Sequence, residues 1–71
     1  MQYKDLGKYI RNKRIEAGFS LNEFALSNDI DPAILSRIEN IQQNIKLNIL
    51  EKIASGFGMT PAQFLGEFEK L

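Results

Sequence analysis

The chain has 71 residues, a formal net charge of zero and a sequence pI of about 6.2, and 44% of its residues are hydrophobic. This length predicts one small folded domain over residues 1–71 and excludes a large enclosed catalytic cavity. Because cysteine and histidine are both absent, thiol chemistry, disulfides and the commonest metal ligands and general bases are excluded, and we expect no enzyme, metal or cofactor.

The distribution of charge is more informative than its sum. Five cations lie near the start of the chain: Lys4, Lys8, Arg11, Lys13 and Arg14. Apart from Arg14, these cations form either a solvated helix face or a flank that contacts phosphate groups, and the sequence leaves both open. No signal peptide or apolar run near twenty residues is recognisable, so we expect a cytoplasmic protein without a membrane span.

The first predicted helix begins at Tyr3 or Lys4 and ends at Ala17, where Gly18 supplies a stop signal. The residues of its predicted inner face recur at spacings of three and four: Tyr3, Leu6, Ile10, Arg14 and Ala17. This periodicity predicts an amphipathic helix packed on a core.

Two helix-start signals follow, eleven positions apart. Ser20 and Glu23 form a capping box, in which each side chain bonds the backbone N–H of the other residue, and it opens a helix over Leu21–Ser27. Asp31 is a good N-cap, and Pro32 suits the first position of a helix over Pro32–Glu39. Residues 27–29 favour a turn, so residues 20–40 predict a helix-turn-helix with 32–39 as the recognition helix.

The predicted recognition helix divides into two faces. Its apolar residues gather on one side: Ile34, Leu35, Ile38 and Ile41. The other side is predicted to face solvent: Pro32, Ala33, Ser36, Arg37 and Asn40. This division predicts one face packed on the core and one face free for a partner.

The remaining segments predict a loop and two more helices. Residues 40–46 are mostly polar and predict a loop, followed by a helix over Leu47–Phe57 that Gly58 ends. A final helix opens at Thr60-Pro61, which combines a capping box with proline at the first position. No segment alternates with a period of two, so the fold class is all-α.

This five-helix pattern resembles the Cro/phage-repressor type of helix-turn-helix domain, the XRE family, over about Leu6 to Leu65. The matching stretches are Leu6-Gly7, Ile10-Arg11, Arg14, Gly18-Phe19-Ser20, Glu23-Phe24-Ala25, Leu35-Ser36-Arg37-Ile38-Glu39-Asn40, Leu47, Leu50, Ile53-Ala54, Gly58-Met59-Thr60 and Phe64-Leu65. The resemblance implies a compact, lambda-repressor-like domain that binds DNA.

The chain departs from the family pattern at four places. Leu21 stands where the family usually has glutamine, and Asn28-Asp29 stands in the turn where it usually has glycine. Ile41 replaces the glycine that follows the recognition helix, and Asn40 is able to end that helix instead. The start of the recognition helix, Asp31 to Ile34, is poor in long polar side chains. These departures leave the strength and mode of base reading open.

Arg37 is the leading candidate for a base contact, because arginine paired with guanine is the commonest specific contact in the major groove. The alternative is a solvated side chain or one that binds only phosphate. Pro32 and Ala33 either contact a thymine methyl or only start the helix, and Ser36 is a weaker polar candidate.

Phosphate contacts are expected from two further places. The loop after the recognition helix supplies polar side chains: Asn40, Gln42, Gln43 and Lys46. The start of the preceding helix supplies Ser20, Leu21 and Asn22, with backbone N–H groups and the positive end of the helix dipole.

Two sets of residues are expected to be structural. The resemblance implies that Arg14 and Glu39 form a partly buried ion pair that joins the first and third helices. The aromatic and aliphatic residues of the C-terminal region exceed the needs of a small core, and we expect a dimer interface from Phe57, Phe64, Phe68 and Leu71.

The sequence thus favours a sequence-specific transcriptional regulator, a repressor or autoregulator, that binds double-stranded DNA as a homodimer on a two-fold operator. Small regulators of this type include phage repressors, controllers of restriction–modification genes, and antitoxins. The alternative is a protein-interaction module that keeps the fold but binds DNA weakly, with a protein partner such as a toxin. Zero net charge, Leu21 and the apolar start of the recognition helix favour that alternative.

Overall fold

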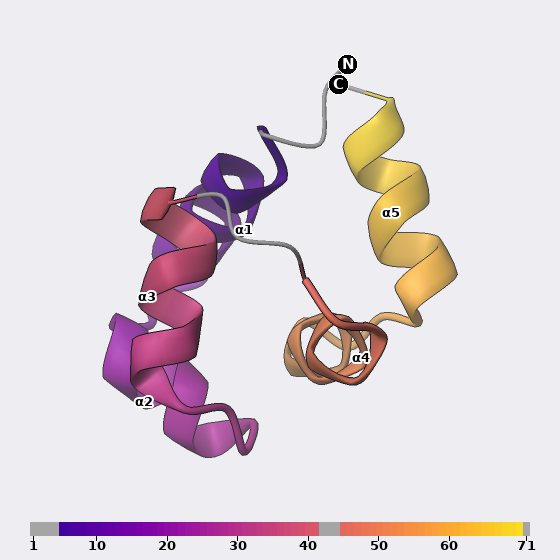
Figure 1. Ribbon diagram of the computed structural model, residues 1–71. Coiled ribbons are helices and arrows are strands. Elements are labelled where there is room, and N and C mark those ends of the chain that lie inside the picture. Colours follow the sequence, from indigo (N-terminus) through magenta and orange to yellow (C-terminus); the bar gives the residue numbers. More distant parts are fainter. Residues whose placement is uncertain (1–4, 42–44, 71) are drawn as a thin grey trace.

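The computed structural model describes residues 5–41 and 45–70. Its five helices follow in the order α1 (Leu6–Glu16), α2 (Leu21–Ser27), α3 (Pro32–Ile41), α4 (Leu47–Gly56) and α5 (Pro61–Glu69) (Figure 1). No strand occurs in these two described ranges. The all-α, five-helix fold class is therefore confirmed.

The predicted capping boxes set the starts of α2 and α5. Ser20 Oγ accepts from the Glu23 N–H at 3.1 Å, and the Ser20 N–H donates to the Glu23 carboxylate at 3.0 Å. Thr60 and Gln63 make the same two bonds, at 3.1 and 2.9 Å, ahead of Pro61. These bonds satisfy N–H groups that have no partner within the helix.

Three predicted helix ends were wrong by one or two residues. α1 ends at Glu16, so Ala17 is its C-cap and is exposed rather than on the inner face. α4 ends at Gly56, and Phe57 is its C-cap. α3 continues to Ile41, so Asn40 lies inside the helix, where its side-chain amide donates to the Ser36 carbonyl at 2.9 Å. The predicted loop at 40–46 therefore begins later, and the start at Tyr3 or Lys4 lies outside the described residues.

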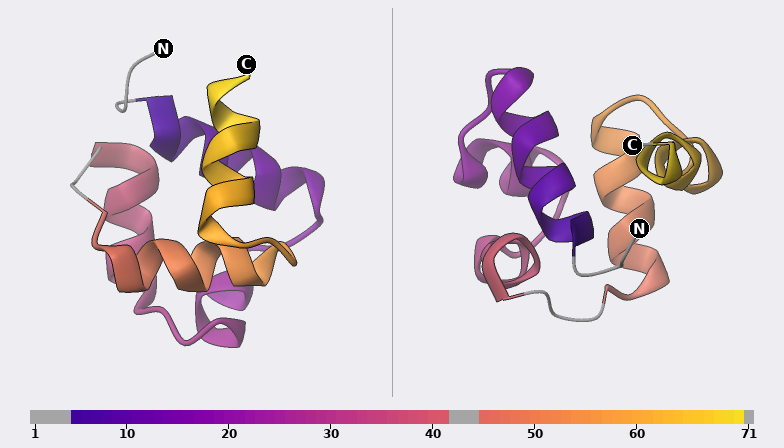
Figure 2. Two further views of the ribbon diagram at one scale, coloured as in Figure 1. Left: turned by 90° about the vertical axis from the view of Figure 1, so that its right-hand side faces the viewer. Right: turned by 90° about the horizontal axis from the view of Figure 1, so that it is seen from above.

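One core joins all five helices. Figure 1 shows α1, α2 and α3 on one side and α4 and α5 on the other, and the right view of Figure 2 keeps this grouping. The closest helix pairs are α1 with α3, α2 with α3, and α4 with α5. The buried core residues are Leu6, Ile10, Phe24, Ala25, Ile30, Leu35, Ile38, Leu50, Ile53, Ala54, Phe64 and Phe68.

A connected series of aromatic rings links the two sides of this core. Phe24 stacks on Phe57 at 4.7 Å between centroids, and Phe57 stacks on Phe64 at 5.9 Å. Tyr9 of α1 then lies 5.3 Å from both Phe64 and Phe68 of α5. The rings fill the space between α2, α1 and the α4–α5 pair.

This packing corrects the predicted dimer interface. Phe64 is 0% exposed and Phe68 is 4% exposed within a single chain, so neither side chain offers surface to a partner. The prediction that they form the interface was wrong, because α5 uses its aromatic residues to close the core against Tyr9. Phe57 is half-buried, and Leu71 lies outside the described residues.

Tyr9 also makes a polar contact between α1 and α5. Its hydroxyl donates to Glu67 Oε1 at 2.8 Å, and Lys13 Nζ donates to the same oxygen at 3.0 Å. Burial, with help from the adjacent Glu67 carboxylate, raises the pKa of Tyr9 to about 12. The hydrogen bonds from Tyr9 and Lys13 lower the pKa of Glu67.

The raised pKa of Tyr9 predicts a loss of stability in alkali. The ordinary pKa is 10.0, so folding favours the neutral phenol, and this contribution is complete below pH 10 and is lost as the pH rises toward 12. Its size is about 1–2 kcal/mol after allowance for solvent screening. Urea unfolding of the wild type and of Tyr9→Phe between pH 9 and about 12 measures it, since phenylalanine keeps the ring but cannot ionise. Parallel pH profiles for the two proteins would contradict the prediction.

Candidate nucleic-acid interface

The two faces of α3 are arranged as the sequence predicts. Leu35 and Ile38 are 0% and 2% exposed and belong to the core, and Ile34 is half-buried against it. On the opposite face Ala33, Arg37 and Asn40 are exposed, whereas Pro32 and Ser36 are half-buried. The side chain of Ile41 lies outside the described part of the structure.

The turn between α2 and α3 is held by backbone and side-chain bonds. Asn28 donates from its amide to the Phe24 carbonyl at 2.7 Å, and the Ile30 N–H donates to the Ala25 carbonyl at 2.8 Å. Asp29 adopts a positive φ of 57°, a conformation that aspartate tolerates better than most side chains. Ile30, 3% exposed, anchors the turn in the core.

Lys52, which belongs to α4, contacts this turn directly and helps to hold it in place. Its Nζ donates to the Asp29 carbonyl at 2.8 Å and lies 3.5 Å from Asp29 Oδ2. The backbone contact carries most of the effect, because the Asp29 carboxylate is almost fully exposed and solvent screens its charge. Sequence reasoning missed this role of Lys52, since it depends on how α4 packs beside α2.

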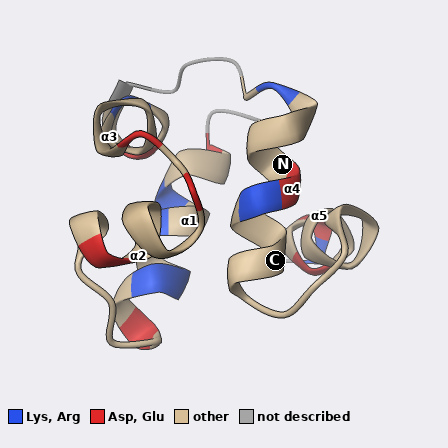
Figure 3. Ribbon diagram, turned by 90° about the horizontal axis from the view of Figure 1, so that it is seen from below, with Lys and Arg blue, Asp and Glu red and all other residues tan. Residues whose placement is uncertain are grey.

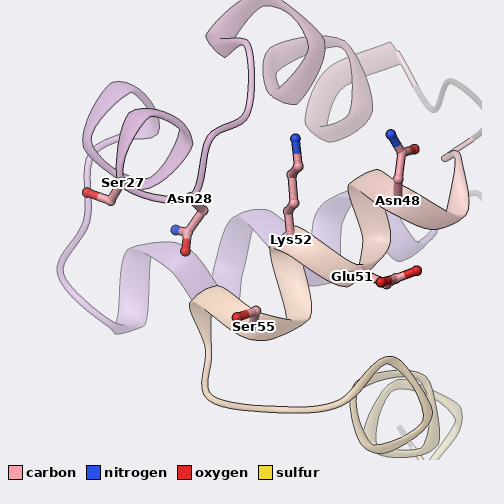
Figure 4. A pocket seen from close by; sticks show the side chains of 6 residues that line it. All are labelled: Ser27, Asn28, Asn48, Glu51, Lys52 and Ser55. Carbon is pink, nitrogen blue, oxygen red and sulfur yellow. The ribbon is translucent and has the colours of Figure 1, made fainter.

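An open depression of about 490 Å³ surrounds Lys52. Residues with polar side chains line it, from the end of α2 and one side of α4: Ser27, Asn28, Asn48, Glu51, Lys52 and Ser55 (Figure 4). Because Lys52 is already bound to Asp29, the depression is part of the turn's support rather than a separate charged site.

Arg14 and Glu39 join α1 to α3 through a buried ion pair. Arg14 Nε and Nη2 each donate to one Glu39 carboxylate oxygen at 2.9 Å, and the two side chains are 9% and 1% exposed. Arg14 Nη1 also donates to the Phe19 carbonyl at 2.7 Å. The hydrogen bond to Glu39 raises the pKa of Arg14 in spite of burial. The pair therefore holds the last turn of α3 and the loop after α1 in place.

The start of α2 retains less free hydrogen-bonding capacity than the sequence suggests. The capping box occupies the Ser20 N–H and uses Ser20 Oγ as an acceptor, which leaves the hydroxyl hydrogen. Leu21 is half-buried on the core, and Asn22 is exposed. The hydrogen bonds from Ser20 lower the pKa of Glu23, so a negative charge sits beside this helix start.

The predicted phosphate-binding loop is only partly described. Asn40 belongs to α3, Gln42 and Gln43 lie outside the described residues, and Lys46 is exposed at the N-cap of α4. Figure 3 shows the cations and anions interspersed over the described helices. Within the described ranges neither Arg37 nor Lys46 takes part in an ion pair, so both charges face solvent.

The described residues contain no group of three or more histidine, cysteine, aspartate or glutamate side chains that could hold a metal ion. No helix in the same residues is both long and apolar enough to cross a membrane.

Comparisons with known proteins fit this geometry. The model of a helix-turn-helix family matches residues 10–64, which include α2, the turn and α3. A control protein, C.MunI from Mycoplasma sp, is 35% identical over 63 residues, covering 89% of this chain and 82% of the relative. No solved structure matches the chain. The chain therefore belongs to the helix-turn-helix family, of the Cro/phage-repressor or XRE type, and is a non-enzymatic DNA-binding transcription regulator.

Proposed function

We propose that this protein is a repressor or autoregulator that binds a short, roughly palindromic operator as a homodimer, with α3 in the major groove. The observation that carries the proposal is the exposed face of α3, which the core and the Arg14–Glu39 pair hold rigidly outward. The major groove of B-DNA is wide enough to admit a helix. The likeness to a control protein supports a regulatory role.

Residues on and beside α3 have separate roles in this proposal. Arg37, exposed and without a salt-bridge partner in the described ranges, reads a base edge. Pro32 and Ala33 pack on a thymine methyl, and Ser36 is a weaker contact. Phosphates are bound by Asn22 at the start of α2, with Ser20 and Leu21, and by the segment from Asn40 to Lys46.

The homodimer needs apolar surface that the core leaves exposed. Around α4 and α5, Leu47 is 66% exposed, and Phe57 and Leu65 are half-buried. We propose that this side of the molecule, with Leu71, pairs with a second copy. A two-fold protein then matches half-sites about 34–36 Å apart.

Two substitutions distinguish base reading from phosphate binding. Arg37→Ala should weaken the preferred site by about 1–3 kcal/mol and relax the preference at one position in each half-site. Lys46→Ala should weaken all sequences similarly and reduce the slope of log K against log salt by about 1. Binding titrations on the preferred site and on its single-base variants, at several salt concentrations, measure both effects. If the two variants behave alike, Arg37 binds phosphate and the base-reading role is wrong.

Selection from a random DNA pool tests the function as a whole. We expect enrichment of two-fold symmetric sequences at low salt, bound by a dimer in sedimentation experiments. Failure to enrich any sequence would favour the alternative of a protein-interaction module with a partner such as a toxin. Zero net charge, the half-buried Leu21 and the exposed apolar Leu26, 70% exposed, are the observations that favour this alternative.

A further inference from the structure

The first turn of α3 presents an unusual set of groups to solvent. Pro32 has no N–H, and the side chains of Pro32 and Ala33 are hydrocarbon. The N–H groups of Ile34 and Leu35 both donate to the Asp31 carbonyl, at 2.9 and 3.1 Å. The Ala33 N–H donates to Asp31 Oδ1 at 2.9 Å. Each N–H in this turn therefore already donates to Asp31, and none can donate to a DNA phosphate. The polar group that can still form hydrogen bonds at this helix start is the Asp31 carboxylate.

The Asp31 carboxylate has a fixed position and one free oxygen. The bond from the Ala33 N–H holds Oδ1 against the helix start, while the residue as a whole is exposed. Among the described residues, no hydrogen bond or ion pair uses Oδ2. Ala33, whose N–H holds Asp31 Oδ1, lies one helical turn before Arg37 on the exposed face, so the Asp31 carboxylate lies at the N-terminal end of the surface that Ala33 and Arg37 form.

The two charged groups of this surface have opposite hydrogen-bonding character. An ionised carboxylate only accepts hydrogen bonds, whereas a guanidinium only donates them. At a rise of about 1.5 Å per residue, Asp31 and Arg37 are ~9 Å apart along the helix, which spans about two to three base pairs. They can therefore contact different base pairs of one half-site.

We propose that Asp31 determines specificity by accepting a hydrogen bond from a cytosine amino group in the major groove. The inference rests on the proposed function of α3. Guanine and thymine present acceptor oxygens there, which would repel the carboxylate, and adenine places an acceptor N7 beside its amino group. Cytosine offers the N4 amino group and has no acceptor of its own in the major groove, so it is the base that a fixed carboxylate favours.

The experiment compares sequences selected from a random pool by the wild type, Asp31→Asn and Asp31→Ser. Asparagine and serine are both good N-caps, so each keeps the helix start while removing the charge. We expect each variant to lose the cytosine preference at one position per half-site, by about 5- to 100-fold, with the other positions unchanged. Thermal unfolding midpoints close to the wild-type value would show that both variants are folded.

Asp29→Asn is the matched control. It removes the same charge from the neighbouring turn, asparagine tolerates the positive φ of 57°, and the backbone carbonyl still accepts from Lys52. We expect this variant to bind all sequences somewhat more tightly, with the base preferences of the wild type.

The outcomes separate the inference from the proposed function. If the wild type enriches an operator and both Asp31 variants enrich the same one, Asp31 is only a cap and the inference is wrong. A base preference that shifts equally in Asp29→Asn would also overturn it, because the effect would then be one of charge alone. Enrichment of no sequence by the wild type would refute the proposed function and the inference together.

Discussion

Gly7→Ala is expected to destabilise the protein by about 3 kcal/mol, at the upper end of the range for overpacked sites. A Cβ at Gly7 would overlap the Ile38 carbonyl oxygen and lie 3.4 Å from the Glu39 Cα, so it would meet the backbone of α3. A flexible side chain could move aside, but here the two helices themselves must separate. Urea unfolding measures the loss as a lower midpoint with an unchanged slope.

Gly66→Ala is the matched control for this prediction. Gly66 lies inside α5, and nothing lies within 4 Å of a Cβ built there. Alanine lowers the entropy of the unfolded chain and favours a helix, so this variant should gain about 0.5–1 kcal/mol. Wild-type stability in Gly7→Ala, with the expected gain in Gly66→Ala, would mean that α1 and α3 are not packed this closely.

The contact at Gly7 also bears on function, because it sets how closely α3 packs against α1 and therefore where the exposed face of α3 lies. A folded Gly7→Ala protein would carry a displaced α3, with Arg37 and Asp31 moved together. We expect its DNA affinity to fall even at temperatures where the protein remains folded. A variant that loses stability without moving the recognition helix would instead keep wild-type DNA affinity at such temperatures.

Local features of the fold follow from the sequence pattern, whereas the Arg14–Glu39 contact between helices was implied only by the family resemblance and other tertiary contacts were not predicted. The capping boxes and the two-faced pattern of α3 depend only on residues that are close together in the sequence. The helix starts and the buried face of α3 can therefore be predicted from the sequence. Gly7 carries no local signal, since its role depends on a carbonyl in another helix. The end of α3 was missed because Asn40, which suits a helix end, instead bonds back to Ser36 within the helix.

Aromatic residues show a second limit. A surplus of apolar side chains in the C-terminal region suggests exposed surface, but Phe64 and Phe68 are buried because Tyr9 of α1 meets them. Composition counts apolar residues without showing which helix covers them. At the candidate interface the same holds for Lys52, whose bond to Asp29 depends on the position of α4.

Glu39→Ala is expected to cost about 3 kcal/mol or slightly more, the range for breaking one partner of a buried ion pair. The substitution leaves the Arg14 guanidinium, whose side chain is 9% exposed, without its counter-charge and without two of its hydrogen bonds. Of the three hydrogen bonds that the described residues give Arg14, the one to the Phe19 carbonyl remains. A lower midpoint in urea unfolding, with the slope unchanged, measures the loss.

The double variant Arg14→Met with Glu39→Leu tests the physical reason. Replacing both charges by apolar side chains of similar volume removes the buried, uncompensated charge, and such replacements are often neutral. We therefore expect the double variant to be more stable than Glu39→Ala, although it also loses the bond to Phe19. If Glu39→Ala unfolds at the wild-type midpoint, the ion pair has no structural role, and the apolar core together with the close packing of Gly7 against Ile38 holds α3 on α1.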